Sequence, residues 1–283
     1  MAETLQSAQL IQAVQVAHDA EVRQSANGVR FATFGETGVE RVDLDRMLEA
    51  VPTAIVAALK ANTYYFVPLA LRERTEPQAP PEQAMVANAY TDEYSDAAIC
   101  HRNVELGAGH RGVFISTRLM GDRFALSFEF FINVAHAFVD QAGVPKSFGD
   151  LVWQQALDNV RGETSIDAWD SRHLALGRNP SVDPEPSAAT PSRRNRAFSS
   201  APATTASPTI DEKERGLFLE STFSDAVAIY LLSLALDFDY SELREREYPL
   251  LSPNALAARL RLVADLFPPN KGYEFAVRYR RRA

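Results

Sequence analysis

Residues 97–130, AAICHRNVELGAGHRGVFISTRLMGDRFALSFEF, decide the fold class of this chain. Three apolar-rich segments, 97–106, 112–119 and 123–130, are separated by short connections that contain glycine. Glycine adopts the left-handed backbone conformations that tight turns require. In the last segment large apolar residues occupy every second position, which gives a strand one apolar face. The stretch therefore predicts a three-stranded antiparallel meander.

Apolar residues at spacings of three and four predict amphipathic helices on both sides of the meander. The predicted helices cover residues 5–22, 45–59 with a kink or restart at Pro52, 131–141, 147–160, 211–236 and 253–266. Further strands are predicted at 29–34 and 39–44 as a hairpin, at 63–71 with Pro68 at an edge or bulge, and at 273–279. Thr209 with Glu212 matches a capping box for the helix that follows.

The composition changes abruptly between residues 178 and 210, where Pro, Ser, Ala and Thr predominate. Such a segment buries too little apolar surface to offset its conformational entropy, so we expect a disordered linker. It separates an α+β body, residues 1–177, from a helical segment with a terminal strand, residues 211–283. The expected fold class is α+β: an antiparallel meander sheet flanked by amphipathic helices, with the helical C-terminal segment docked on it.

The overall composition predicts a soluble cytoplasmic protein. The 283 residues are 46% hydrophobic, the formal net charge is −8, and there is one cysteine. The acidic balance argues against a broad nucleic-acid-binding face, and one cysteine excludes an intramolecular disulfide. The apolar runs 124–139 and 226–236 are too short or too polar to span a bilayer, and the N-terminus lacks the features of a signal peptide. The excess of arginine over lysine, with abundant alanine, indicates a GC-rich bacterial genome.

A polar stripe is predicted on the helix that follows the meander. Asn133, His136 and Asp140 share one helical face, and Glu129 joins that face if the helix begins earlier. A carboxylate beside a histidine fixes its tautomer and raises its basicity, which suits a general base. These four residues are the candidate catalytic group. The alternative is an ordinary solvent-exposed face of a half-buried helix.

His101, His136 and Asp96 are candidate metal ligands, because acidic residues precede the meander and could join the histidines in a divalent-metal site. None of the paired spacings typical of zinc sites is present. A solvated acidic loop is the alternative for Asp96. Cys100 is adjacent to His101, and we expect its thiol to be buried as a small apolar group.

Two other features are candidates for ligand contact. The glycine-rich turn 107–112 carries His110 and Arg111, but a hairpin turn explains its glycines, and it matches no nucleotide-binding fingerprint, so no cofactor is identified. Two arginine clusters stand out against the acidic background and suit contact with a polyanion or an acidic partner. They comprise Arg193, Arg194, Arg196, Arg280, Arg281 and Arg282.

Together these features favour a non-catalytic binding or assembly subunit of an intracellular bacterial complex, with a protein partner or a second copy of the chain and no membrane. Two alternatives remain. The first is a metal-dependent or thiol-dependent hydrolase centred on His136. The second is a nucleic-acid-associated protein that uses the arginine clusters.

Overall fold

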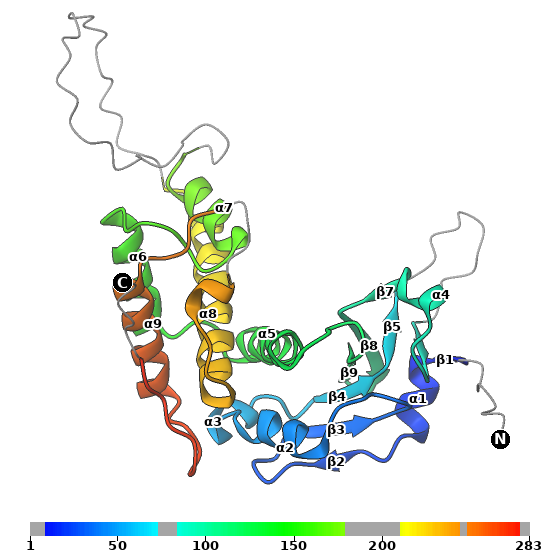
Figure 1. Cartoon of the computed structure of the whole chain (residues 1–283). Coiled ribbons are helices and arrows are strands. Elements are labelled where there is room, and N and C mark those ends of the chain that lie inside the picture. Colours follow the sequence, from blue (N-terminus) through cyan, green and yellow to red (C-terminus); the bar gives the residue numbers. More distant parts are fainter. Residues whose placement is uncertain (1–8, 73–83, 179–209, 244–247, 278–283) are drawn as a thin grey trace, which may run out of the picture. The chain divides into compact units, whose positions relative to one another are not determined.

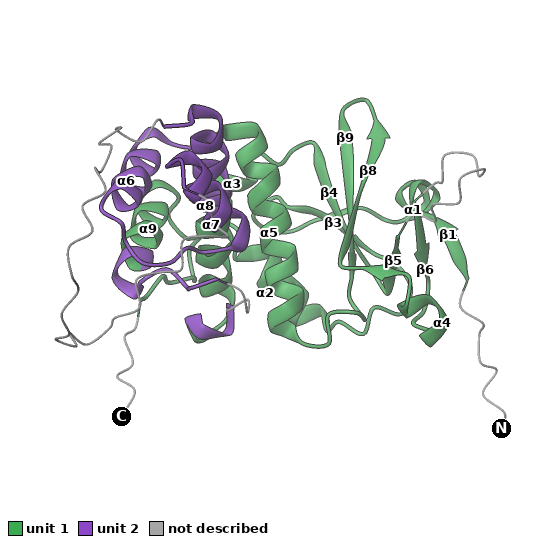
Figure 2. Ribbon diagram, turned by 90° about the horizontal axis from the view of Figure 1, so that it is seen from above, with its two compact units in different colours: residues 1–143, 224–239, 257–283 green, residues 144–223, 240–256 purple. Residues whose placement is uncertain are grey.

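The computed structural model describes residues 9–72, 84–178, 210–243 and 248–277 (Figure 1). The chain forms two compact units (Figure 2). Unit 1 contains residues 1–143, 224–239 and 257–283, and unit 2 contains residues 144–223 and 240–256. The predicted α+β class is confirmed, because both helices and sheets are present and helices pack on the sheets.

A five-stranded mixed sheet forms the centre of unit 1. Its strand order is β2 (Arg23–Gln24), β3 (Arg30–Thr33), β4 (Asn62–Val67), β9 (His110–Ser116) and β8 (His101–Gly107). The three inner strands are parallel, and the two edge strands are antiparallel to their neighbours. All six residues of β4 are buried, as expected for a central parallel strand that is covered on both faces.

A second sheet of four short strands is antiparallel throughout. Its order is β1 (Leu10–Gln12), β6 (Met85–Ala87), β5 (Leu69–Leu71) and β7 (Ala98–Ile99). Pro68 separates β4 from β5 and cannot donate a ladder hydrogen bond. The single strand predicted at 63–71 is therefore two strands in two sheets, and Pro68 is neither at an edge position nor in a bulge.

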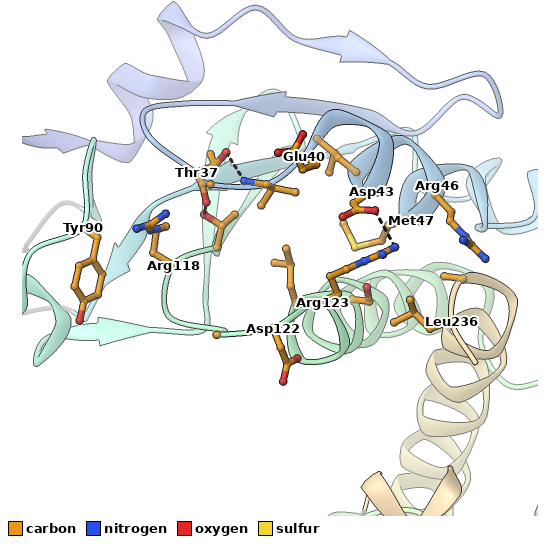
Figure 3. A pocket seen from close by; sticks show the side chains of 18 residues that line it. Thr37, Glu40, Asp43, Arg46, Met47, Tyr90, Arg118, Asp122, Arg123 and Leu236 are labelled. Carbon is orange, nitrogen blue, oxygen red and sulfur yellow. Dashed lines mark hydrogen bonds and ion pairs between the residues drawn. The ribbon is translucent and has the colours of Figure 1, made fainter. Parts of the chain in front are cut away.

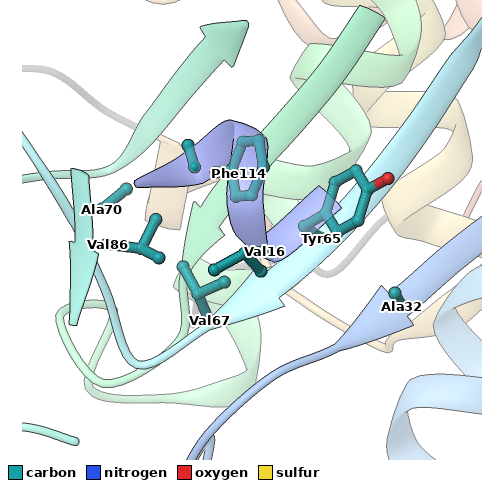
Figure 4. Close-up of a cluster of buried hydrophobic side chains, with 8 residues drawn as sticks. Val16, Ala32, Tyr65, Val67, Ala70, Val86 and Phe114 are labelled. Atoms are coloured by element: carbon teal, nitrogen blue, oxygen red, sulfur yellow. The ribbon is translucent and has the colours of Figure 1, made fainter. Parts of the chain in front are cut away.

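The two sheets pack together through one apolar cluster. Tyr65, Val67 and Phe114 of the large sheet and Ala70 and Val86 of the small one belong to this cluster (Figure 4). Val16, from α1 (Ala13–Asp19), completes this layer. The rings of Tyr65 and Phe114 are stacked at 4.6 Å.

The opposite face of the large sheet is covered by α2 (Arg41–Glu49), α3 (Thr53–Val56) and α5 (Arg123–Ala142), as Figure 2 shows for the green unit. Side chains of a strand alternate between faces, so Tyr64 and Phe66 point toward α5. Their ring centroids lie 5.1 Å and 5.7 Å from that of Phe130.

The C-terminal helices α8 (Glu212–Ala235) and α9 (Pro253–Leu266) each pass from unit 2 into unit 1. Within unit 1, the Tyr230 hydroxyl donates to the Phe267 carbonyl at 2.7 Å, and the ring of Phe138 lies 5.1 Å from that of Phe267. The helix predicted at 253–266 is confirmed.

Unit 2 is built from α6 (Lys146–Leu157), α7 (Ile166–Ala175) and the first part of α8. Phe148 packs against Phe223 at 4.8 Å between ring centroids. A buried ion pair joins Arg172 of α7 to Glu163 at 3.2 Å.

The prediction of a third meander strand at 123–130 is wrong, because residues 123–142 form the helix α5. Leu126, Phe130 and Val134 follow the four-residue spacing of one buried helical face. The Asp122 carboxylate accepts from the Ala125 N–H at 2.7 Å and caps the first turn. The alternation of apolar residues at 124–130 is also compatible with a helix that is apolar over much of its surface.

The predicted hairpin at 29–44 is also wrong. Residues 30–33 form β3, but α2 begins at Arg41, and β3 pairs in parallel with β4 instead. The helix predicted to begin at residue 45 begins at Arg41 instead, whereas the restart predicted at Pro52 is confirmed by α3.

The remaining elements differ in detail. Of the helix predicted at 5–22, the described part, residues 9–22, is helical only at 13–19, and the sequence did not predict the short helices α4 (Asp92–Ser95) and η1 (Tyr240–Leu243). Residues 273–277 contain no strand. The proposed linker lies almost entirely at 179–209, outside the described residues, as does Thr209. Asp211 is described, and its Oδ1 accepts from the N–H groups of Lys213 and Glu214 at 3.0 Å and 3.2 Å.

In the described part of the chain, α8 is the one helix long and apolar enough to cross a bilayer. Of its most apolar 18-residue window, 67% is buried inside the structure. The core helix of a folded domain has the same length and composition, so α8 is weak evidence for a membrane span.

Candidate functional site

The predicted polar stripe of α5 is divided by the structure into a buried part and an exposed part. Asn133 is buried, and its Nδ2 donates to the Glu129 carbonyl at 2.8 Å and to Glu129 Oε1 at 3.1 Å. His136 and Asp140 are exposed, and Asp140 lies 3.9 Å from Arg111. Neither cavity described below is lined by His136.

Glu129 contacts a different histidine, His101, at the start of β8. His101 Nδ1 lies 2.5 Å from Glu129 Oε1, and the side chains are 39% and 15% exposed. A carboxylate at Nδ1 holds the imidazole in the tautomer whose Nε2 can accept a proton. The arrangement of His101, Glu129 and Asn133 therefore has the chemistry of an oriented general base.

The prediction that Cys100 is a buried apolar group is wrong, because Cys100 is exposed. It lies at the break between β7 and β8, where its carbonyl accepts from the Ser116 N–H at 2.9 Å. Partial burial of the thiol, together with the negative charge of Glu129, raises the pKa of Cys100 above its ordinary value. The thiolate, which is the nucleophilic form, is thereby disfavoured.

The three predicted metal ligands do not come together. Among the residues that the structure describes, no three His, Cys, Asp or Glu side chains gather closely enough to hold a metal ion. Asp96 is exposed at the end of α4, and His136 is exposed on α5. His101 contacts Glu129 instead.

The glycine-rich turn joins the antiparallel strands β8 and β9, so its glycines belong to a hairpin turn. His110 in this segment is exposed. The arginines of the two clusters (Arg193, Arg194, Arg196, Arg280, Arg281 and Arg282) lie outside the described residues, so their role stays a prediction.

A cavity of about 390 Å³ lies where the parallel strands β3 and β9 end. Residues 37–40, between β3 and α2, form one wall, and residues 117, 118, 121 and 122, between β9 and α5, form another together with Arg123, the first residue of α5 (Figure 3). In open sheets with parallel strands, ligands bind outside the carboxyl ends of the strands. We call this space the carboxyl-edge cavity.

Arg118 and its surroundings distinguish this cavity. The Arg118 side chain has no hydrogen bond or ion pair with any described residue, and it lies over Gly38, where a Cβ would be 2.4 Å from Nη1. Gly38 has a φ of +67°, which also favours glycine. In Figure 3, Arg118 lies in the part of the cavity that is close to Tyr90 and Thr37.

The other charged groups of the cavity are partly neutralised within it. Asp43 is paired with Arg123 at 2.9 Å, and Asp122 caps α5. Glu40 and Arg46 also line the cavity. The Glu40 side chain does not cap α2, so it accepts no hydrogen bond from the first N–H groups of that helix.

The loops that form the cavity are tied to the sheet. The Thr117 hydroxyl lies 2.8 Å from the Thr37 carbonyl and 3.1 Å from the Val67 carbonyl. This contact joins the segments that follow β3, β4 and β9. The lining residues include no histidine and no cysteine, so the cavity offers positioned charges but neither an imidazole base nor a thiol.

Sequence reasoning missed this cavity because the segments that bracket it, 39–44 and 123–130, were predicted to be strands. The available signal was the charged and glycine residues directly after two apolar strands, at 35–41 and 118–123. No protein-family model, curated protein or solved structure matches this chain.

Proposed function

We propose that this protein binds a small organic anion in the carboxyl-edge cavity. The observation that carries the proposal is the guanidinium of Arg118, which lines the cavity without a counter-charge among the described residues. A planar guanidinium binds a carboxylate or phosphate with two parallel hydrogen bonds. The start of α2, with its N–H groups directed along the helix axis, adds positive potential to the same space.

The remaining groups limit which anion suits the cavity. The carboxylate of Glu40 has no partner among the described residues and can accept hydrogen bonds, and Thr37 and Tyr90 supply further polar atoms. Leu44, Met47 and Leu126 supply apolar walls. A ligand that has one acidic group, one hydrogen-bond donor such as an amino group, and a short apolar part fits these groups. A volume of about 390 Å³ is within the range of small-molecule sites.

The absence of histidine and cysteine from the lining residues supports binding rather than nucleophilic catalysis in this cavity. The composition and motifs also favour a non-catalytic binding protein, but with a protein partner or a second copy of the chain as the ligand. Membership of a larger complex, a protein partner and a cytoplasmic location stay predictions.

The test is calorimetric titration of the full chain with amino acids, short dicarboxylates and phosphorylated three-carbon acids. We expect saturable binding of at least one of them, weakened about tenfold or more by Arg118→Gln, because a charge-assisted pair contributes roughly 1.5–3 kcal/mol. Arg41→Gln is the matched control, since Arg41 is exposed, pairs with Asp45 and does not line the cavity. Equal affinity of the two variants would contradict the proposal.

Hydrolysis at His101 is a second candidate, favoured by the contact between His101 and Glu129. If His101 is a general base, the chain should hydrolyse an activated ester such as p-nitrophenyl acetate, and both His101→Gln and Glu129→Gln should reduce the rate by roughly 10²-fold. His110→Gln, in the exposed turn, is the control for unspecific imidazole reactivity. Equal rates in the His101 and His110 variants would rule out this role.

A further inference from the structure

A second cavity lies at the opposite edge of the large sheet, where β3 and β4 begin. Its volume is about 250 Å³, and all its lining residues belong to unit 1. They come from the segment before β3, from α3 and the turn after it, and from the first residues of β4. We call it the amino-edge cavity. It shares no lining residue with the carboxyl-edge cavity.

Two buried polar side chains line the amino-edge cavity without partners. Tyr64 is 1% exposed, and its hydroxyl has no hydrogen-bond partner in the described part of the chain. Asn62 is 6% exposed, and its side-chain amide makes no hydrogen bond to a described residue. Buried polar groups in folded proteins are nearly always hydrogen-bonded, so the Tyr64 hydroxyl on this cavity wall requires an explanation.

The Tyr64 hydroxyl is held in place as a hydrogen-bond donor. The Tyr64 ring packs edge-on against Phe130 with 5.1 Å between centroids, which fixes the direction of the side chain. Burial raises the pKa of Tyr64 well above its usual range, so the hydroxyl stays protonated. The Asn62 amide supplies two further donor hydrogens.

The charges that line the cavity are all positive. Arg30 and Lys60 contribute a guanidinium and an ammonium group, and no Asp or Glu lines the cavity. Arg30 Nη1 donates to the Lys60 carbonyl at 3.4 Å, which keeps the guanidinium at the cavity wall. The Lys60 ammonium has no partner among the described residues.

The remaining wall is apolar. Val29, Val56 and Leu59 line the cavity and are buried, with exposed fractions of 2%, 8% and 4%. Gly28, beside Val29, has a φ of +101°. A Cβ at Gly28 would lie 3.4 Å from Val56 Cγ1, an ordinary contact distance, so the positive φ and not a lack of space favours glycine here.

From this arrangement we propose that the amino-edge cavity is a second ligand site, which takes a small carboxylic acid with an apolar body. The carboxylate accepts hydrogen bonds from Tyr64 and Asn62, and Arg30 and Lys60 balance its charge. The apolar body lies against Val29, Val56 and Leu59. The inference does not depend on the proposed function, because the two cavities are lined by different residues.

Benzoate and hexanoate are the probes, with benzamide as a neutral ligand of the same shape as benzoate. Binding to the full chain is measured by calorimetry and by the shift of the unfolding temperature. We expect saturable binding of at least one carboxylate and at least tenfold weaker binding of benzamide. Tyr64→Phe should weaken the carboxylate about tenfold, because it removes one donor and leaves the ring.

The unliganded Tyr64→Phe variant should unfold at the same temperature as the wild type or a higher one, since the hydroxyl it removes has no partner among the described residues. Arg118→Gln, in the other cavity, should leave benzoate and hexanoate affinity unchanged. If the carboxylates bind and Arg118→Gln, rather than Tyr64→Phe, abolishes binding, the ligand occupies the carboxyl-edge cavity and the amino-edge site is refuted. Absence of binding of both carboxylates by the wild type would also refute it, without touching the proposed function, which concerns other ligands.

Discussion

Arg172→Met tests how much the buried ion pair of unit 2 contributes to its stability. The Arg172 and Glu163 side chains are 5% and 0% exposed, and Nη1 of Arg172 lies 3.2 Å from Glu163 Oε1. The same Nη1 donates to the Gly162 carbonyl at 3.1 Å. The substitution keeps most of the side-chain volume but removes the guanidinium of Arg172 from Glu163 and from the Gly162 carbonyl.

Removing one partner of a buried ion pair costs about 3–5 kcal/mol, because the remaining charge stays in a medium of low polarity. That is a large share of the roughly 5–15 kcal/mol by which a typical domain is stable. Backbone contacts also hold the segment that carries Glu163. Gly162 has a φ of +78°, and the N–H groups of Glu163 and Leu251 bond to the carbonyls of Pro249 and Glu163 at 3.0 Å and 2.9 Å.

Urea unfolding followed by tryptophan fluorescence is the assay, since both tryptophans of the chain, Trp153 and Trp169, lie in unit 2. With a denaturant dependence of about 2 kcal/mol per M, we expect the midpoint to fall by about 2 M in Arg172→Met. The losses of Arg172→Met and Glu163→Leu should not add in the double variant, whose loss should be smaller than their sum because both changes remove the same ion pair. A midpoint change below about 0.5 M in Arg172→Met, or a double variant whose loss equals the sum of the two single losses, would refute the reasoning.

Gly35→Ala should destabilise unit 1 more than Gly109→Ala. Both glycines have positive φ, which costs a Cβ-bearing residue about 1 kcal/mol. Only at Gly35 would the new Cβ meet backbone, because it would lie 2.2 Å from the Asn88 carbonyl oxygen. Thermal unfolding of the two variants measures the difference in stability. Equal losses would show that this close approach is unimportant. Cys100 should react slowly with iodoacetamide at pH 7.5, because its raised pKa keeps most of the thiol protonated at that pH. Glu129→Gln should lower this pKa and speed alkylation, and an unchanged rate would exclude the charge of Glu129 as a cause.

Sequence periodicity predicted the strongly amphipathic elements well. The helix at 253–266 and the restart of the chain after Pro52 are present where expected. Both depend on local properties: the spacing of apolar residues along one helix, and the fixed φ of proline.

The identity of segment 123–130 was not determined by its local pattern. The pattern fits a strand, because large apolar residues occupy every second position: Phe124, Leu126, Phe128 and Phe130. It also fits a helix whose surface is apolar on most sides. Burial on several sides weakens the amphipathic signal from which the two periods are distinguished. The parallel pairing of β3 with β4 was hidden for a related reason, because parallel pairing joins segments that are distant in sequence.

In the candidate site, too, contacts within one helix were predictable from the sequence and contacts between distant segments were not. The sequence marked Glu129 and Asn133 as neighbours on one helical face, and the structure places them in contact. Only the tertiary structure selected His101 instead of His136 as the histidine that meets Glu129, because that choice depends on how β8 lies against α5.

By itself the sequence determined the α+β class, the positions of the most regular helices and the neighbours along each helix. These features follow from interactions between residues a few positions apart. The tertiary structure alone decided the mixed sheet, the two cavities at its opposite edges, and the positions of Arg118 and Tyr64, whose polar groups have no partner in the described part of the chain. The physical reason is that a cavity and the pairing state of a buried group depend on contacts between distant segments, which no local pattern records.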